Sequence, residues 1–258
     1  MIDSHLHLDE NVDGTADGAA FELNKQLQEA GIIRCIVLHL ESQPWSVEEF
    51  SDAISLYPKL YGFINVHPYK NSSVQDLATG IDLYGFIGLK LHPRLQEFDL
   101  DDDRTVTLVN AAGEMDIPVL FDAFPDGTHL MQGFSPLKYA TLARKCPATN
   151  IIWAHMGGHY VLDFMMLAKR LPNVYMDLSY SFLYYQNSPV IDNMIYAMSS
   201  MKYDRIFYGS DYPDRPIGAS LNRTLEILRE KAVSETDIMK IMSGNAINFF
   251  KWNDLYQS

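Results

Sequence analysis

Ile32-Ile33-Arg34-Cys35-Ile36-Val37-Leu38-His39-Leu40 is the stretch from which the fold can be worked out. Its apolar and β-branched residues are typical of a strand that is buried on both faces of a parallel sheet. The residues before it have helical spacing, with Phe21, Leu23, Leu27 and Ala30 on one face, and Gly31 follows as a helix stop. The stretch therefore predicts a helix that leads into a buried parallel strand.

The same alternation continues along the chain. Strands are predicted over residues 1–7, 32–40, 60–66, 86–91, 118–123, 151–155, 174–179 and 205–210. Helices are predicted over residues 16–30, 46–56, 74–84, 104–115, 136–145, 160–170, 189–201 and 221–231. Eight strand–helix units in about 250 residues predict an α/β protein, a (β/α)8 TIM barrel. A doubly wound open sheet is the alternative, but no Gly-x-Gly-x-x-Gly fingerprint follows the first strand.

One domain is expected over residues 1–258, because barrels of this length are commonly single domains. No further strand is predicted after the stretch from residue 234 to residue 254. We therefore predict that this stretch forms an extra C-terminal helix that packs on the outside of the barrel.

Composition restricts the partners. The net charge of −13 disfavours binding to nucleic acid or to an anionic membrane, because both require basic patches. No apolar run approaches the roughly 20 residues of a membrane span, and residue 1 is not followed by the pattern of a signal peptide. Cys35 and Cys146 form no metal or redox motif, which favours a reducing compartment. We therefore expect a cytoplasmic protein with a small-molecule substrate, and homo-oligomerisation is left open.

Polar side chains lie near the ends of all eight predicted strands: His5, His7, His39, Asn65, His67, Lys90, His92, Asp122, His155, Asp177, Ser179 and Asp211. Barrels place their active sites at the C-terminal ends of the strands. Ionisable groups are costly to bury without partners, so this set predicts one shared site.

The first strand contains a His-x-His pair. Side chains at positions i and i+2 of a strand point to the same face, so Asp3, His5 and His7 are expected on one face. Two imidazoles at this spacing can converge on one cation, and imidazole suits zinc.

Several stretches together resemble the amidohydrolase superfamily, in the branch called amidohydrolase-related or amidohydrolase 2. They are Asp3–His7 (DSHLH), Gly88–Pro93 (GLKLHP), Ala154–Gly158 (AHMGG), Asn173–Asp177 (NVYMD), Tyr208–Pro213 (YGSDYP) and Gly244–Ala246 (GNA). They occur in the order and on the strands that the family uses.

The resemblance implies a metal-dependent hydrolase. His5, His7 and Asp211 take the positions of family metal ligands, and His155 takes a position that ligates metal or polarises the substrate carbonyl. A cation with an open coordination position lowers the pKa of its bound water to about 7, and Asp211 would take the proton. One zinc is the expected cofactor, with manganese or another divalent ion as alternatives.

The sequence departs from the family on the fifth strand, where Asp122 replaces the usual histidine. Asp122 is predicted to bind the metal or to hold a ligand histidine. Lys90 stands where two-metal relatives carry a carbamylated lysine, and it could equally neutralise an anionic substrate or pair with Asp122. One metal and an unmodified, catalytic Lys90 are expected, while His92 either lines the pocket or serves the structure.

Arg94, His67, Tyr180 and Arg215 are predicted to bind substrate, since arginine matches carboxylates and the aromatics could cover an organic ligand. Further loop candidates are Trp45, Phe124, His129, His159, Tyr184 and Tyr185. The predicted reaction is attack of water on an ester, lactone or amide of a small, carboxylated molecule. A one-metal decarboxylase, a metal-free lactonase and a non-catalytic binding barrel are the alternatives.

Overall fold

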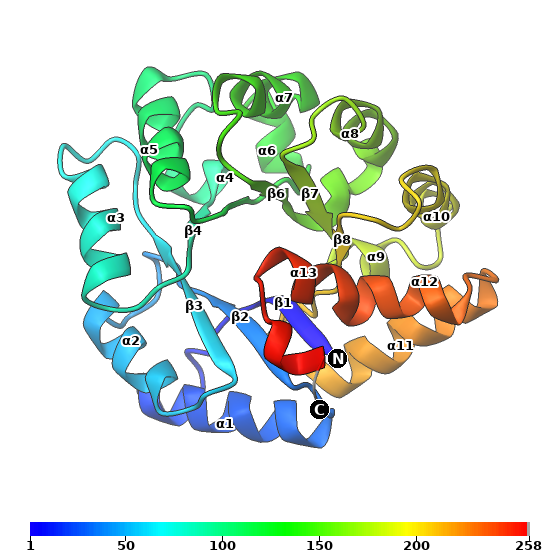
Figure 1. Cartoon of the computed structure of the whole chain (residues 1–258), viewed down its shortest axis with the longest axis horizontal. Coiled ribbons are helices and arrows are strands. Elements are labelled where there is room, and N and C mark those ends of the chain that lie inside the picture. Colours follow the sequence, from blue (N-terminus) through cyan, green and yellow to red (C-terminus); the bar gives the residue numbers. More distant parts are fainter. Residues whose placement is uncertain (257–258) are drawn as a thin grey trace.

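The computed structural model describes residues 1–256 and confirms the α/β barrel (Figure 1). Its eight strands follow one another around a single parallel sheet: β1 (Ile2–Leu6), β2 (Arg34–Leu38), β3 (Leu60–Asn65), β4 (Gly88–Leu91), β5 (Val119–Phe121), β6 (Ile151–Trp153), β7 (Val174–Asp177) and β8 (Ile206–Phe207). Ser4 N donates to the carbonyl oxygen of Tyr208 at 2.9 Å and links β1 to the residue after β8. The chain therefore returns to its first strand, as a barrel requires.

Long helices surround the strands (Figure 1). They are α1 (Ala16–Glu29), α2 (Val47–Ser55), α3 (Ser73–Asp82), α5 (Asp103–Glu114), α7 (Pro136–Lys145), α8 (Val161–Ala168), α10 (Val190–Ser200) and α11 (Ile217–Glu230). Each matches a predicted helix. Local signals fix their starts: Ser46 and Glu49, for example, form a reciprocal capping box at α2. Among residues 1–256, no helix is long and apolar enough to cross a membrane.

Three short helices and one 3-10 segment were not predicted. They are α4 (Pro93–Gln96), α6 (Gly127–Met131), α9 (Ser181–Tyr184) and η1 (Ala154–Tyr160). All of them follow a strand directly or within a few residues, so they belong to the loops at the C-terminal end of the barrel.

The strands carry two apolar layers. Side chains such as Ile36, Phe63 and Phe207 fill the barrel, whereas Val37 and others pack between the strands and the helices. In β1, Ile2 belongs to the inner layer and Leu6 to the outer one, although both are even-numbered. The reason is a register shift: Asp3 pairs with Cys35, but Leu6 pairs with Val37, so β1 contains one extra residue. The predicted strict alternation of Asp3, His5 and His7 is therefore wrong, because a β-bulge separates Asp3 from the histidines.

The C-terminal stretch also differs from the prediction of one helix on the outside. It consists of α12 (Glu235–Met239), the π-helical η2 (Lys240–Gly244), α13 (Asn245–Phe249) and η3 (Asn253–Tyr256). In Figure 1 its red end crosses the centre of the barrel. Aromatic rings explain the position: the ring centroid of Phe249 lies 4.4 Å from that of Tyr175 on β7, and that of Trp252 lies 4.9 Å from that of Tyr61 on β3. The segment closes the N-terminal end of the barrel.

Candidate active site

A cavity of about 360 Å³ lies at the C-terminal ends of the strands. Eight of the ten predicted site residues line it: His5, His7, Lys90, Arg94, Asp122, His155, Tyr180 and Asp211. The structure therefore brings these eight side chains together at this end of the barrel, and we call this cavity the barrel pocket.

His5 is held by residues of β7 and the loop that follows it. Its Nδ1 donates to Oδ2 of Asp177 at 2.9 Å, and its Nε2 lies 3.2 Å from Oδ1 of Asp211. Because the carboxylate of Asp177 fixes the proton on Nδ1, the lone pair of Nε2 points to Asp211 and is free for a cation.

His7 is oriented in a similar way. Its Nδ1 donates to the carbonyl oxygen of Leu38 at 2.8 Å, and its Nε2 lies 3.8 Å from the same Oδ1 of Asp211. Burial lowers the pKa of His7 to about 3, so the ring is neutral and can act as a ligand. Asp211 itself has a positive φ of 59° and lies four residues beyond the end of the short β8. Burial alone would raise its pKa, but His5, His155 and His7 hold it well below its ordinary value.

His155 is the second residue of the unusual η1 segment and has a φ of 62°. Its Nδ1 lies 3.0 Å from the carbonyl oxygen of Ser179, and its Nε2 lies 3.2 Å from Oδ1 of Asp122. Both ring nitrogens thus face acceptors. Burial alone lowers the pKa of His155, but the Asp122 and Asp211 carboxylates outweigh it and raise the pKa to about 9.

His5, His155 and Asp211 offer ligand atoms that all lie within 4.8 Å of one another. The three groups are a set of donors that suits a divalent cation, and zinc in particular accepts imidazole and carboxylate. The Nε2 of His7 lies next to this set of donors, because it is 3.8 Å from Oδ1 of Asp211. The residues present therefore fit a metal ion.

Asp122 is a carboxylate around which three histidines of the site gather. Its Oδ2 is buried and has no hydrogen-bond partner among residues 1–256; it lies 3.6 Å from Nδ1 of His92 and 3.9 Å from Nδ1 of His129. Burial opposes ionisation, yet His92, His155 and Lys90 together lower the pKa of Asp122 well below its ordinary value. The carboxylate is thus a fixed negative charge.

Lys90 is almost fully buried on β4. Burial lowers its pKa, and the carboxylates of Asp122, Asp211 and Asp177 oppose that shift. Its ammonium makes no ion pair or hydrogen bond with residues 1–256. Its charge is therefore stabilised by the combined attraction of these three carboxylates rather than by one contact.

Two residues of the site were recognised in the sequence only as polar strand positions. Asp177 accepts hydrogen bonds from the backbone N of His155 and of Ser179, each at 3.0 Å, in addition to that from His5. The hydroxyl of Ser179 donates to Asp177 and lies 3.1 Å from Nδ1 of His5 and 2.9 Å from Nδ1 of His155. The polar run on the seventh strand was the signal for these supporting roles.

Two predicted substrate residues do not line the barrel pocket. His67 lines a neighbouring cavity with Asn65 and Gln96, where its Nδ1 accepts from the backbone N of Tyr69 at 3.0 Å. Arg215 extends beside Asp214, with its Nε 3.4 Å from that carboxylate. The reason is the direction of each loop, which turns these side chains away after the strand ends.

Aromatic rings form one wall of the barrel pocket. Phe124 and Tyr180 line it, with ring centroids 4.9 Å apart, and Tyr184 stacks on Tyr180 at 5.3 Å. Tyr185 lies behind Phe124 at 6.2 Å, and His159 contacts the Tyr185 hydroxyl. Of the other loop candidates, Trp45 is buried and donates to the carbonyl oxygen of Gly14, and His129 lines a different cavity.

An eight-stranded parallel barrel with histidines and carboxylates gathered at its C-terminal end defines a class of barrel with a metal-competent pocket. A family model described as Amidohydrolase matches residues 52–252. The chain belongs to the amidohydrolase family. It matches none of the curated proteins with which it was compared.

Solved structures share the fold at low sequence identity. A probable 2-pyrone-4,6-dicarboxylic acid hydrolase from Acinetobacter baumannii, with citric acid bound, is 14% identical, with a TM-score of 0.69 and coverage of 97% of this chain and 98% of that chain. An amidohydrolase from Burkholderia multivorans with bound zinc has the same identity, TM-score and coverages. A 5-carboxyvanillate decarboxylase from Sphingomonas paucimobilis is 12% identical, with a TM-score of 0.66 and coverages of 97% and 98%.

Proposed function

We propose that this protein is a metal-dependent hydrolase that acts on an ester, lactone or amide bond of a small, carboxylated molecule. One observation carries the proposal: His5 and His7 each use Nδ1 for a hydrogen bond to an acceptor and turn Nε2 toward the same oxygen of Asp211. That arrangement suits a single divalent ion held by these three residues, and the zinc-bound relative favours zinc.

A divalent ion in this pocket would lower the pKa of a water molecule and polarise a substrate carbonyl. Asp211 is ionised at neutral pH and borders the proposed ligands, so it can accept a proton and later return it to the leaving group.

We assign His155 to the substrate carbonyl rather than to the metal. Its Nε2 lies 3.2 Å from Oδ1 of Asp122, whereas Nε2 of His5 and Nε2 of His7 face Oδ1 of Asp211. The nitrogen that could bind the ion is therefore engaged by a carboxylate outside the proposed ligand set. His155 can instead stabilise negative charge that develops on the substrate oxygen. Asp122 holds the ring in place, and Lys90 and Arg94 offer positive charge to a substrate carboxylate.

The test compares zinc content and affinity in His7→Gln and His155→Gln variants of the whole protein. We expect His7→Gln to weaken zinc binding and His155→Gln to keep zinc but lose turnover in a screen of esters, lactones and carboxylated aromatics. If neither variant nor the wild type binds zinc, the proposed metal site is wrong. If only His155→Gln loses zinc, His155 is a ligand and the assigned roles must be exchanged.

A decarboxylase is the second candidate, because Lys90 and Arg94 border the barrel pocket and a decarboxylase shares the fold. Product analysis in ¹⁸O-labelled water separates the two reactions. Incorporation of solvent oxygen supports hydrolysis, and release of carbon dioxide without incorporation supports decarboxylation.

A further inference from the structure

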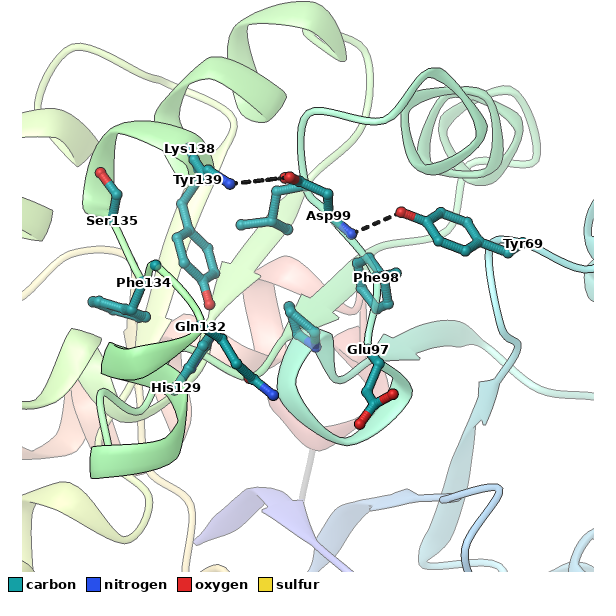
Figure 2. A pocket seen from close by; sticks show the side chains of 13 residues that line it. Tyr69, Glu97, Phe98, Asp99, His129, Gln132, Phe134, Ser135, Lys138 and Tyr139 are labelled. Carbon is teal, nitrogen blue, oxygen red and sulfur yellow. Dashed lines mark hydrogen bonds and ion pairs between the residues drawn. The ribbon is translucent and has the colours of Figure 1, made fainter.

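A second cavity of about 340 Å³ lies beside the barrel pocket (Figure 2). The two cavities share no lining residue. Two short helices separate them: in α4, Pro93 faces the second cavity and Arg94 the barrel pocket, while His129 of α6 faces the second cavity and Asp126, the N-cap of α6, faces the barrel pocket. We call the second cavity the rear cavity.

Aromatic rings from three segments of the chain wall the rear cavity: Tyr69, Phe98, and the pair Phe134 and Tyr139. Figure 2 shows Phe134 and Tyr139 on one side and Phe98 on the other. The walls are fixed before any ligand arrives. The Tyr69 hydroxyl accepts from the backbone N of Asp99 at 2.9 Å, and the guanidinium of Arg104 lies 3.5 Å from the Tyr69 ring centroid. Such a preformed cleft with aromatic walls is typical of a site for a flat organic ring.

The charged residues that line the rear cavity favour an uncharged ring over an anionic one. Lys138 and Asp99 pair across the cavity, with Nζ 3.0 Å from Oδ2, so this ammonium is already neutralised (Figure 2). Glu97 adds a second carboxylate to the lining. An anionic ligand would meet more negative than positive charge, whereas an uncharged ring would not, and Gln132 offers an amide for one polar substituent.

Two residues that line the rear cavity, Tyr139 and His129, also contact Asp122. The Tyr139 hydroxyl donates to the carbonyl oxygen of Asp122 at 2.7 Å, and Nδ1 of His129 lies 3.9 Å from Oδ2 of Asp122. A ligand in the cavity would pack against both side chains. Its location is thus directly behind the strand-five carboxylate of the barrel pocket.

We propose that the rear cavity is a second small-molecule site that binds an uncharged, single-ring aromatic compound of the phenol class. The volume is at the lower end of those known for ligand pockets, which limits the occupant to about one ring with small substituents. The inference is independent of the proposed hydrolase reaction.

The probe is p-cresol, with 4-methylbenzoate as its charged counterpart, titrated into the whole protein by calorimetry. We expect p-cresol to bind at least about tenfold more tightly than 4-methylbenzoate. The variant Leu100→Trp places a larger side chain in the rear cavity, and it should weaken p-cresol binding by about tenfold or more. Leu137→Trp, at an exposed position of α7, is the matched control and should bind p-cresol as the wild type does.

Circular dichroism and urea unfolding check that both variants are folded, and a crystal soaked with p-cresol locates the ring. The proposal is overturned if p-cresol does not bind, if Leu100→Trp binds it as tightly as the wild type, if the charged compound binds equally well, or if the soaked ring lies in the barrel pocket. If Leu100→Trp fails to fold, the narrower Leu100→Phe serves in its place, with Leu137→Phe as its control. The same outcomes then decide.

Discussion

Ser179 sits where the supports of two histidines meet. Its hydroxyl is buried, donates to Asp177, and lies within 3.1 Å of Nδ1 of both His5 and His155. A single oxygen therefore helps to orient a proposed metal ligand and the proposed electrophile. Groups that orient ligand histidines typically affect metal affinity almost as strongly as the ligands do.

We predict that Ser179→Ala weakens zinc binding by about 10- to 100-fold, because His5 loses part of its orientation. Competition with a chelating dye measures the affinity. Ser220→Ala is the control, since Ser220 is also buried but bonds the Tyr208 hydroxyl at 3.4 Å, away from the histidines. Equal zinc affinity in both variants would contradict the orienting role.

His39 gives a pH dependence of stability. Burial lowers its pKa from 6.5 to about 4, so between these values the unfolded chain binds a proton that the folded protein does not. The free energy of unfolding should therefore fall as the pH drops below 6.5. The part due to His39 is about 2 kcal/mol between pH 7.5 and pH 5.

The measurement is urea unfolding of wild type and His39→Gln at pH 7.5 and pH 5. The variant should lose about 2 kcal/mol less than the wild type over this interval. His159→Gln, which changes a surface histidine, should behave as the wild type. The same pH response in His39→Gln and wild type would show that His39 is not the titrating group.

At the scale of elements, the approach of β1, β7 and β8 depends on Gly209. A Cβ at this position would lie 2.6 Å from Cβ of His5 and 3.0 Å from Cβ of Ser179. Real side chains do not come that close, so the strands would have to separate where they present His5. The absence of a side chain at Gly209 is what allows the site to close.

We predict that Gly209→Ala lowers both the free energy of unfolding and the zinc affinity, each by an amount typical of overpacking, about 1–3 kcal/mol. Gly218→Ala is the matched control, because nothing lies within 4 Å of its added methyl group in α11. It should stabilise the protein by about 0.4–1 kcal/mol and leave zinc binding unchanged. Chemical denaturation and dye competition give both quantities.

The elements show what the sequence could reveal. Apolar runs and helical spacing predicted the eight strands and their long helices, because these depend on local patterns. The bulge in β1 could not be seen, because Asp3-Ser4-His5 reads as regular alternation and only pairing with β2 shows the extra residue. The turns α4 and α6 were also missed, since they are too short to have a hydrophobic period.

The same division applies to the site. Seven of the polar residues predicted at strand ends line the barrel pocket, because parallel strands all end on one side. His67 and Arg215 were misplaced, because the path of a loop after its strand depends on contacts that no local pattern records.

At the scale of the whole molecule, aromatic contacts at the N-terminal end of the barrel, opposite the barrel pocket, contribute to the free energy of unfolding. Trp252 is 7% exposed, its ring stacks with that of Phe250 at 4.7 Å, and the guanidinium of Arg34 lies 5.2 Å from its centroid. We predict that Trp252→Ala lowers the free energy of unfolding by about 3 kcal/mol. Zinc affinity of the folded protein should not change.

Denaturant titration measures the loss, and Tyr196→Ala, at a ring that is 61% exposed, should cost less than about 0.5 kcal/mol. If Trp252→Ala also weakened zinc binding, the two ends of the barrel would be coupled rather than independent.

The position of the C-terminal aromatics has a consequence for how the protein is made. Ile2 leaves the ribosome before the other strands of the barrel, yet its inner layer is completed by Ile247 and Trp252, which are added after all eight strands have been synthesised. Until these residues are added, the inner apolar side chains of the earlier strands remain uncovered at the N-terminal end of the barrel. Contacts between such distant parts of a chain form slowly and expose apolar surface in the meantime. Chaperone dependence during translation should therefore be greatest just before residue 247 emerges, and it should end soon afterwards.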